Sequence, residues 1–290
     1  NYTAEYFNPD GSLWFSEPLE QGNRAADYTV LFQTDRTNTY KILETKSSAG
    51  VGTHGIKITN RDTGETLFQG KFKVGKFLPP YSEKNEFAFF VEHDWLLPLG
   101  YVGFHFSDIE SGGVPPMVGV WLKGSVEASE LEGRLFYKGQ QIASTKDPRA
   151  GYSTSGVSDA AERMPEMGAL SADLHRWKLW TFQWGNFRWD NGGGGNGYNP
   201  DNHPGAHYGD KNPGEYAVKI YRNNAQVREL KFTVGSDGRI ADKGFARQPH
   251  QLHNRVLVPV TVVAGAEKWN PQASKTDAFY GNPLPGFSVP

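Results

Sequence analysis

Two stretches of the chain read as the same β-hairpin, and this repeat restricts the possible folds more than any other feature. Residues 55–75 (GIKITNRDTGETLFQGKFKVG) and residues 216–235 (YAVKIYRNNAQVRELKFTVG) alternate apolar and polar side chains, pass through a turn and return as Lys-Phe-x-Val-Gly. Alternation with a period of two, interrupted by a turn containing Asn or Gly, is typical of an antiparallel strand pair. The recurrence predicts a duplicated β-unit.

The match extends outward from the repeated hairpin. Residues 2–16 and residues 131–145 share a strand–turn–strand rhythm with glycine in the turn, and each precedes its hairpin along the chain. An apolar, strand-like segment follows each hairpin, at residues 86–97 and 255–265. Because the order is preserved in both halves, the pattern favours duplication over coincidence.

A length of 290 residues suits two domains, since domains usually hold roughly 100–150 residues. The polar, small-residue stretch GSVEASELEG at residues 124–133 is the expected boundary. We therefore predict an all-β chain of two tandem immunoglobulin-like β-sandwich domains. The predicted parts are an N-terminal domain at 1–127, a C-terminal domain at 128–266 with insertions near 147–173 and 190–213, and an extended tail at 267–290. Within the first insertion, Ser158 as an N-cap predicts one or two helical turns.

Composition and charge exclude several classes of partner. Thirty Lys and Arg face 32 Asp and Glu, so no net positive charge draws the chain to nucleic acid. No stretch approaches the ~20 apolar residues of a transmembrane helix. The absence of cysteine removes disulfides and thiolate chemistry. The missing N-terminal Met and the lack of thiols lead us to expect a processed, secreted or periplasmic, cell-envelope protein.

The second insertion holds the most concentrated set of metal-binding side chains. Asp201, His203, His207 and Asp210 lie within ten residues, beside a run of four glycines. The glycines lead into Asn-Pro rather than into a helix, so they do not predict a nucleotide site. Asn199, Asp201 and His203 are spaced like the first oxygen ligands of a calcium loop, although Pro204 stands where that loop needs glycine. The segment therefore predicts either a Ca²⁺ site or a solvated loop held by Asx-turns.

Four of the eight tryptophans lie on the approach to this insertion, at residues 177–189. On a strand Trp180, Phe182 and Trp184 share one face, which predicts core packing. The other prediction is a ligand surface at the edge of the loop, where exposed rings stack on sugars and polar side chains donate hydrogen bonds. Its candidate residues are Trp177, Trp189, Tyr198, Tyr208, Asn199 and Asp201.

A hydrolase is the third functional alternative. Glu92 and Asp94 would share one face of a strand, and two carboxylates at that spacing are typical of glycoside hydrolysis. A cross-strand Lys or Arg paired with one of them explains the same pattern without catalysis. No other catalytic motif is present in the sequence, so no catalytic residue is assigned.

The segment NPGEYAVKI at residues 212–220 resembles immunoglobulin-like domains of bacterial exported proteins, in which a Pro-Gly turn leads into a strand. The main prediction is a non-enzymatic binding or adhesion protein of the bacterial envelope or exterior. It would contact a protein partner through loops of the second domain. A carbohydrate-binding module is the first alternative and a glycoside or metal-dependent hydrolase is the second.

Overall fold

The structure is a computed structural model that describes residues 2–21, 32–33, 51–78, 87–104, 114–147, 156–163, 176–190, 205–241 and 256–269. Within these ranges the chain forms strands and short 3₁₀-helices but no α-helix, which confirms the all-β class. None of the described residues forms a helix long and apolar enough to cross a membrane. The described residues up to Trp95 belong to one compact unit (unit 1) and those from Leu96 onward to a second (unit 2).

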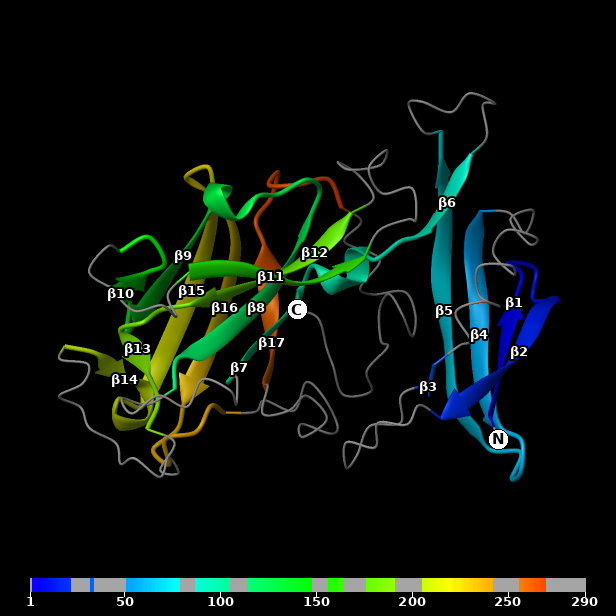
Figure 1. Cartoon of the computed structure of the whole chain (residues 1–290), viewed down its shortest axis with the longest axis horizontal. Helices are drawn as coiled ribbons and strands as arrows, with labels where there is room; N and C mark the ends of the chain where they lie inside the picture. The colour runs from blue at the N-terminus through cyan, green and yellow to red at the C-terminus, as the bar shows by residue number, and fades with distance from the viewer. Residues whose placement is uncertain are drawn as a thin grey trace. The chain divides into compact units, whose positions relative to one another are not determined.

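Unit 1 contains one antiparallel sheet of six strands in the order β3-β2-β1-β4-β5-β6 (Figure 1). The strands are β1 Tyr2–Phe7, β2 Leu13–Gln21, β3 Phe32–Gln33, β4 Gly52–Asn60, β5 Thr66–Phe77 and β6 Ala88–Val91. Side chains alternate between the two faces of a sheet. On β4, His54, Ile56 and Ile58 lie on one face, while Lys57 lies on the other.

Unit 2 contains an antiparallel sheet of nine strands in the order β10-β9-β15-β16-β17-β7-β8-β12-β11. These strands are β7 Leu99–Phe104, β8 Pro116–Lys123, β9 Leu131–Tyr137, β10 Gln140–Ser144, β11 Gly156–Arg163, β12 Trp177–Gln183, β15 Gly214–Arg222, β16 Ala225–Val234 and β17 Val256–Val262. A separate two-stranded parallel pair joins β13 Phe187–Arg188 to β14 His207–Tyr208. Among the described residues, the 3₁₀-helices are η2 Asp94–Leu96, η3 Ala128–Glu130 and η7 Gly209–Lys211.

The turns predicted from the sequence are present as tight hairpins. Lys138 and Gly139 between β9 and β10 have φ of 47° and 83°. Asn223 and Asn224 between β15 and β16 have φ of 48° and 68°. Two successive positive φ values define the type I′ turn, whose twist matches that of the strands it joins. The hairpins predicted at residues 55–75 and 216–235 are confirmed as the antiparallel pairs β4–β5 and β15–β16.

Five strands recur in the two units in the same order and with the same pairing. β2-β1-β4-β5-β6 in unit 1 corresponds to β10-β9-β15-β16-β17 in unit 2. The register agrees as well: His54 lies opposite Phe72 in the first hairpin, and Tyr216 lies opposite Phe232 in the second. Both pairs stack, with ring centroids 5.5 Å and 5.2 Å apart. The repeat read from the sequence therefore has a counterpart in strand topology.

The core of unit 2 lies inside its curled sheet. Trp180 and Phe182 of β12 and Trp184 beyond it belong to the same buried cluster as the inward residues of β9, β15 and β16, which confirms their predicted core role. Gly133 on β9 makes the approach possible: a Cβ there would lie 2.7 Å from Cδ1 of Phe182 and 3.1 Å from Cζ2 of Trp184. A side chain at position 133 would push the rings apart.

Two sequence predictions differ from this architecture. The boundary expected at 127/128 lies inside unit 2, because β7 pairs with β17 and β8 with β12. The helix expected from Ser158 is wrong, since residues 156–163 form β11. Cross-strand pairing with β12 stabilises the extended backbone there and overrides a local capping pattern. The structure supports curled antiparallel sheets, and the immunoglobulin-like description stays a prediction.

Candidate functional site

The two ends of the second insertion meet at β13 and β14. Phe187 lies opposite His207 and Arg188 opposite Tyr208 in this parallel pair, which Figure 1 shows at one end of unit 2. The amide of His207 donates to the carbonyl of Asn186 at 2.7 Å. Residues 191–204, which include Tyr198, Asn199, Asp201 and His203, lie outside the described residues. The described part of the site therefore consists of the residues on either side of this segment, 186–190 and 205–212, which we call the base.

Charged groups tie the two ends of the base together. The amide of Asp190 donates to Oδ1 of Asp210 at 3.0 Å. The Lys211 ammonium lies 3.1 Å from Oδ2 of Asp190 and 3.2 Å from Oδ2 of Asp210. Hydrogen bonds to Asp190 and then Asp210 raise the pKa of Lys211. Lys211 therefore bridges the residue before the segment and the helix after it.

A second link joins His207 to the core through Tyr216. The hydroxyl of Tyr216 donates to the carbonyl of Asn212 at 2.8 Å, and a carbonyl can only accept. The hydroxyl has no second proton, so Nε2 of His207, 2.8 Å from the same oxygen, must be the donor. This assigns the Nε2–H tautomer to neutral His207. Burial lowers the pKa of His207, which favours that neutral form.

Aromatic rings surround this hydrogen-bonded link. The Tyr137 ring lies 4.9 Å from His207 and 4.8 Å from Tyr216, centroid to centroid. Phe187 lies 5.5 Å from Tyr216, which stacks on Phe232. The hydroxyl of Tyr137 donates to the carbonyl of Pro213 at 3.1 Å. Such packing leaves each ring few alternative rotamers, so the base is a rigid platform.

Trp189 is wedged into the base rather than displayed at its surface. Its indole N–H donates to the carbonyl of Gly238 at 2.9 Å. A Cβ on Gly209 would lie 2.1 Å from Cζ3 of Trp189, so only glycine allows this contact. The backbone of Trp189 also forms paired hydrogen bonds with Val114.

These positions correct part of the predicted ligand surface. Trp177, Trp189 and Tyr208 are 0%, 7% and 8% exposed, so their rings belong to the interior and offer no open face for stacking on a sugar. The physical reason is the size of these side chains, since large aromatic rings contribute most to the stability of the fold when they are buried. The remaining predicted contact residues, Tyr198, Asn199 and Asp201, lie outside the described residues.

Two of the four predicted metal ligands, His207 and Asp210, are described, and both bond to protein groups. His207 bonds to Tyr216, and Asp210 accepts a hydrogen bond from Asp190 and pairs with Lys211. No group of three or more metal-ligating side chains occurs among the described residues. Asp201 and His203 lie outside that part of the chain, so the Ca²⁺ site stays a prediction.

The carboxylate pair considered for hydrolysis does not share a strand face. β6 ends at Val91, and Asp94 begins the helix η2. Glu92 pairs with Lys73 on the neighbouring strand at 2.8 Å. The cross-strand ion pair offered as the alternative explanation is therefore present.

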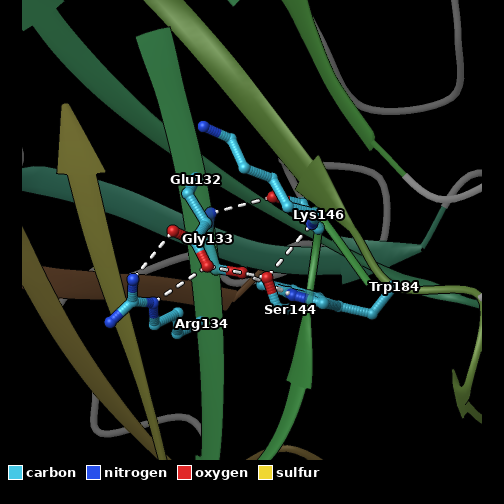
Figure 2. Close-up of polar contacts among 7 residues, drawn as sticks. Glu132, Gly133, Arg134, Ser144, Lys146 and Trp184 are labelled. Carbon is cyan, nitrogen blue, oxygen red and sulfur yellow. Dashed lines mark hydrogen bonds and ion pairs between the residues drawn. The ribbon is translucent and has the colours of Figure 1, made fainter. Parts of the chain in front are cut away.

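A polar cluster on β9 and β10 was not predicted from the sequence. Figure 2 shows Arg134 forming a bidentate pair with Glu132, with both N–O distances 2.9 Å. Ser144 donates to the same carboxylate at 2.8 Å, and Lys146 donates its amide to Ser144. These bonds lower the pKa of Glu132, Arg134 contributing most. The Glu-x-Arg spacing, which places both side chains on one strand face, was the available signal.

The same region links the hairpin to the core. The indole N–H of Trp184 donates to the carbonyl of Gly133 at 2.9 Å (Figure 2). The amide of Gly133 donates to Oγ1 of Thr145 at 3.0 Å. The guanidinium of Arg134 lies 4.1 Å from the Tyr221 ring centroid. Because Glu132 of β9 pairs with Arg134 and accepts a hydrogen bond from Ser144 of β10, the evident role of the cluster is to hold these two strands in register.

Comparisons with known proteins do not place the chain in a family. No family model, no curated protein and no solved structure matches it. The functional argument therefore depends on the site alone.

Proposed function

We propose that this chain is a non-enzymatic binding protein that contacts a protein partner through the segment at residues 191–204 of unit 2. The observation that most supports this proposal is that the two ends of the segment are held together. β13 pairs with β14, and Lys211 forms ion pairs with Asp190 and Asp210. Fixing the ends of a contact segment lowers the entropy lost on binding.

The rigid surroundings of the base support the same function. His207, Tyr216 and Asn212 form a hydrogen-bonded chain, and Trp189 is wedged against Gly209. Binding residues are often carried on loops that a rigid scaffold positions. The segment itself is rich in Gly and Asn and contains Tyr198, residue types that give adaptable contacts in protein-binding loops.

A protein partner is favoured over a sugar for a specific reason. Carbohydrate stacking needs exposed ring faces, and Trp177, Trp189 and Tyr208 are buried. A protein contact needs no such platform, because backbone amides and small polar side chains supply its hydrogen bonds. The bacterial envelope or exterior remains the proposed location, supported by the cysteine-free composition.

The recurrence of five strands supports a related proposal about origin: the two units are duplicated, immunoglobulin-like domains. Equivalent registers at His54–Phe72 and Tyr216–Phe232 support common descent of the hairpins. Unit 2 then differs by its additional strands and by the insertion at its end.

The test replaces residues 191–204 with a short Gly-Ser linker, leaving Asp190, His207, Asp210 and Lys211 in place. Wild type and variant are screened in parallel on a protein array and a glycan array, and their unfolding curves are compared as a folding control. We expect protein hits with the wild type that the folded variant loses. Lys178→Ser, a β12 substitution away from the base, is the matched control and should keep every hit.

Two results would count against the proposal. Protein hits that the variant retains would place the contact elsewhere on the chain. Hits confined to the glycan array would replace the protein partner with a carbohydrate ligand.

A further inference from the structure

A tight turn directs the chain after β17 toward a buried arginine. The amide of Ala266 donates to the carbonyl of Val263 at 3.1 Å, and Gly265 has a φ of 78°, which glycine adopts without strain at the third position of a turn. The amide of Val263 donates to the carbonyl of Val227 at 3.1 Å, so the turn is held against β16. The next residue along the chain is Glu267, and its side chain reaches the interior of unit 2.

Glu267 joins two strands that are not neighbours in the sheet. One carboxylate oxygen, Oε1, pairs with Nη2 of Arg228 on β16. The other, Oε2, accepts a hydrogen bond from the backbone amide of Lys123 on β8 at 2.8 Å. β17 and β7 lie between these two strands in the sheet. The pairing of β7 with β8 ends at Gly100–Val120, so the Lys123 amide lies beyond that ladder and uses the carboxylate as its acceptor.

The side chain of Arg228 is enclosed by protein and is 0% exposed. Its Nε and Nη2 donate to the carbonyl of Trp121 at 3.2 Å and 3.0 Å, and its Nη1 donates to the carbonyl of Val227 at 2.8 Å. Carbonyl groups satisfy N–H donors but carry no net charge, so the carboxylate of Glu267 supplies the opposite charge that a buried guanidinium requires. The loss of either partner would therefore leave a charge in the interior without its counter-ion.

We propose that residues 263–269 are a strap that closes this end of unit 2, and that the Arg228 guanidinium and the Lys123 amide form an internal site for the Glu267 carboxylate. A cationic donor and a backbone N–H on the two oxygens of one carboxylate are a strong combination. Withdrawal of the strap leaves the Arg228 charge buried without its counter-ion, so opening of the strap and loss of the surrounding core are one event. The strap is a different part of the chain from residues 191–204, and either proposal can fail alone.

Amide hydrogen exchange of the full chain, followed by NMR, tests the strap at single residues. In the wild type the Lys123 amide should exchange slowly, because Glu267 accepts its hydrogen bond. Glu267→Ala should speed this exchange at least about tenfold, because the amide loses its acceptor. The same substitution should lower the folding equilibrium constant in urea unfolding at least about 100-fold, because it leaves Arg228 as a buried, uncompensated charge.

Glu229→Ala is the matched control. Glu229 is the neighbour of Arg228 on β16, but it is partly exposed and its ion pair with Lys231 spans 3.5 Å. Because such surface pairs contribute little to stability, this variant should keep both the wild-type unfolding curve and the slow exchange of the Lys123 amide. If Glu267→Ala behaves like Glu229→Ala, the strap does not close unit 2.

A double variant separates the internal site from the charge that it holds. Arg228→Met combined with Glu267→Met removes both charges, so stability should return to within about tenfold of the wild type. Exchange at Lys123 should nevertheless stay fast, because the carboxylate is still missing, while the Val218 amide of β15 regains its protection. A Lys123 amide that regains wild-type protection in the double variant overturns the proposal. A wild-type Lys123 amide that exchanges as fast as an unprotected amide overturns it without any variant.

Discussion

Units 1 and 2 contain the same five-strand arrangement but bury it to different extents. In unit 2 the inward residues of β15 and β16 are sealed beneath β12, and Val218 and Ile220 are fully buried. In unit 1 the corresponding Ile56 and Ile58 are partly buried. The hairpin sequence therefore determines strand pairing and register, whereas the extent of burial depends on strands added outside the repeat.

The strands that unit 2 has in addition to the repeat extend its sheet beyond β17. β17 in unit 2 corresponds to β6 in unit 1, and β17 pairs on its far side with β7, from which β8, β12 and β11 continue. Among the described residues, β6 is the last strand of its sheet. A nine-stranded sheet is wide enough to curl onto its own face, so unit 2 supplies its second layer from within.

The largest expected effect on stability comes from truncating Trp184, a fully buried side chain of the unit 2 core. Trp184→Ala should destabilise unit 2 by about 3–5 kcal/mol, because it deletes a fully buried indole and leaves a cavity beside Phe182. The carbonyl of Gly133 keeps one donor, the amide of Thr145, so cavity formation outweighs hydrogen-bond loss. Urea unfolding followed by far-UV circular dichroism measures the change in the free energy of unfolding.

Trp184→Phe is the matched control for that substitution. It keeps most of the ring volume and loses only the indole N–H donor to Gly133, so a cost of about 0.5–1.5 kcal/mol is expected. If the two substitutions lower the free energy of unfolding equally, then the hydrogen bond to Gly133, and not the packing of the indole ring, stabilises the core.

An intermediate effect is expected when equivalent positions in the two hairpins are truncated. Ile220→Ala should cost about 2–5 kcal/mol, the range for fully buried aliphatic side chains. Ile58→Ala should cost about half as much or less, because the side chain is only partly buried. The two variants are compared by urea unfolding, and a cost at position 58 equal to that at position 220 would remove the distinction between the units.

Local patterns in the sequence predicted the hairpins and missed the longer-range organisation. Alternation and turn residues identified β4–β5 and β15–β16 correctly, including the Asn223–Asn224 turn. The boundary at 127/128 was misplaced because β7 and β8 carry no repeat, and their pairing with β17 and β12 joins residues more than 50 positions apart. Such non-local pairing leaves no signal in a short window of sequence.

The candidate site shows the same limit. The sequence located the insertion and its aromatic approach, but it could not decide which rings are buried. Trp189 and Tyr208 lie beside polar, glycine-rich sequence and still pack inward, Trp189 because Gly209 leaves room for its ring. The Lys211 bridge between Asp190 and Asp210 likewise depends on the β13–β14 pairing, which brings residues twenty positions apart together.

The smallest expected effect concerns the position where the two hairpins differ in chemistry. His54 in unit 1 is replaced by Tyr216 in unit 2, and Tyr216 accepts a hydrogen bond from His207 at the base of the insertion. Burial lowers the pKa of His207 below its value in the unfolded chain, about 6.5. As the pH falls through about 6.5 the unfolded chain binds a proton before the folded chain does, so stability decreases until the pH reaches the folded-state pKa.

His207→Gln should therefore flatten this part of the pH dependence, since glutamine can still donate to Tyr216 but does not titrate. The measurement is the difference in unfolding free energy between pH 7.5 and pH 5.5 for wild type and variant, with His54→Gln as the control in unit 1. Protonation adds a charge at Nδ1 and leaves the Nε2–H donor in place, so the loss reflects burial of charge among Tyr137, Phe187 and Tyr216. If His207→Gln keeps the full wild-type pH dependence, the titrating group lies elsewhere and the base of the insertion is not the pH-sensitive part of unit 2.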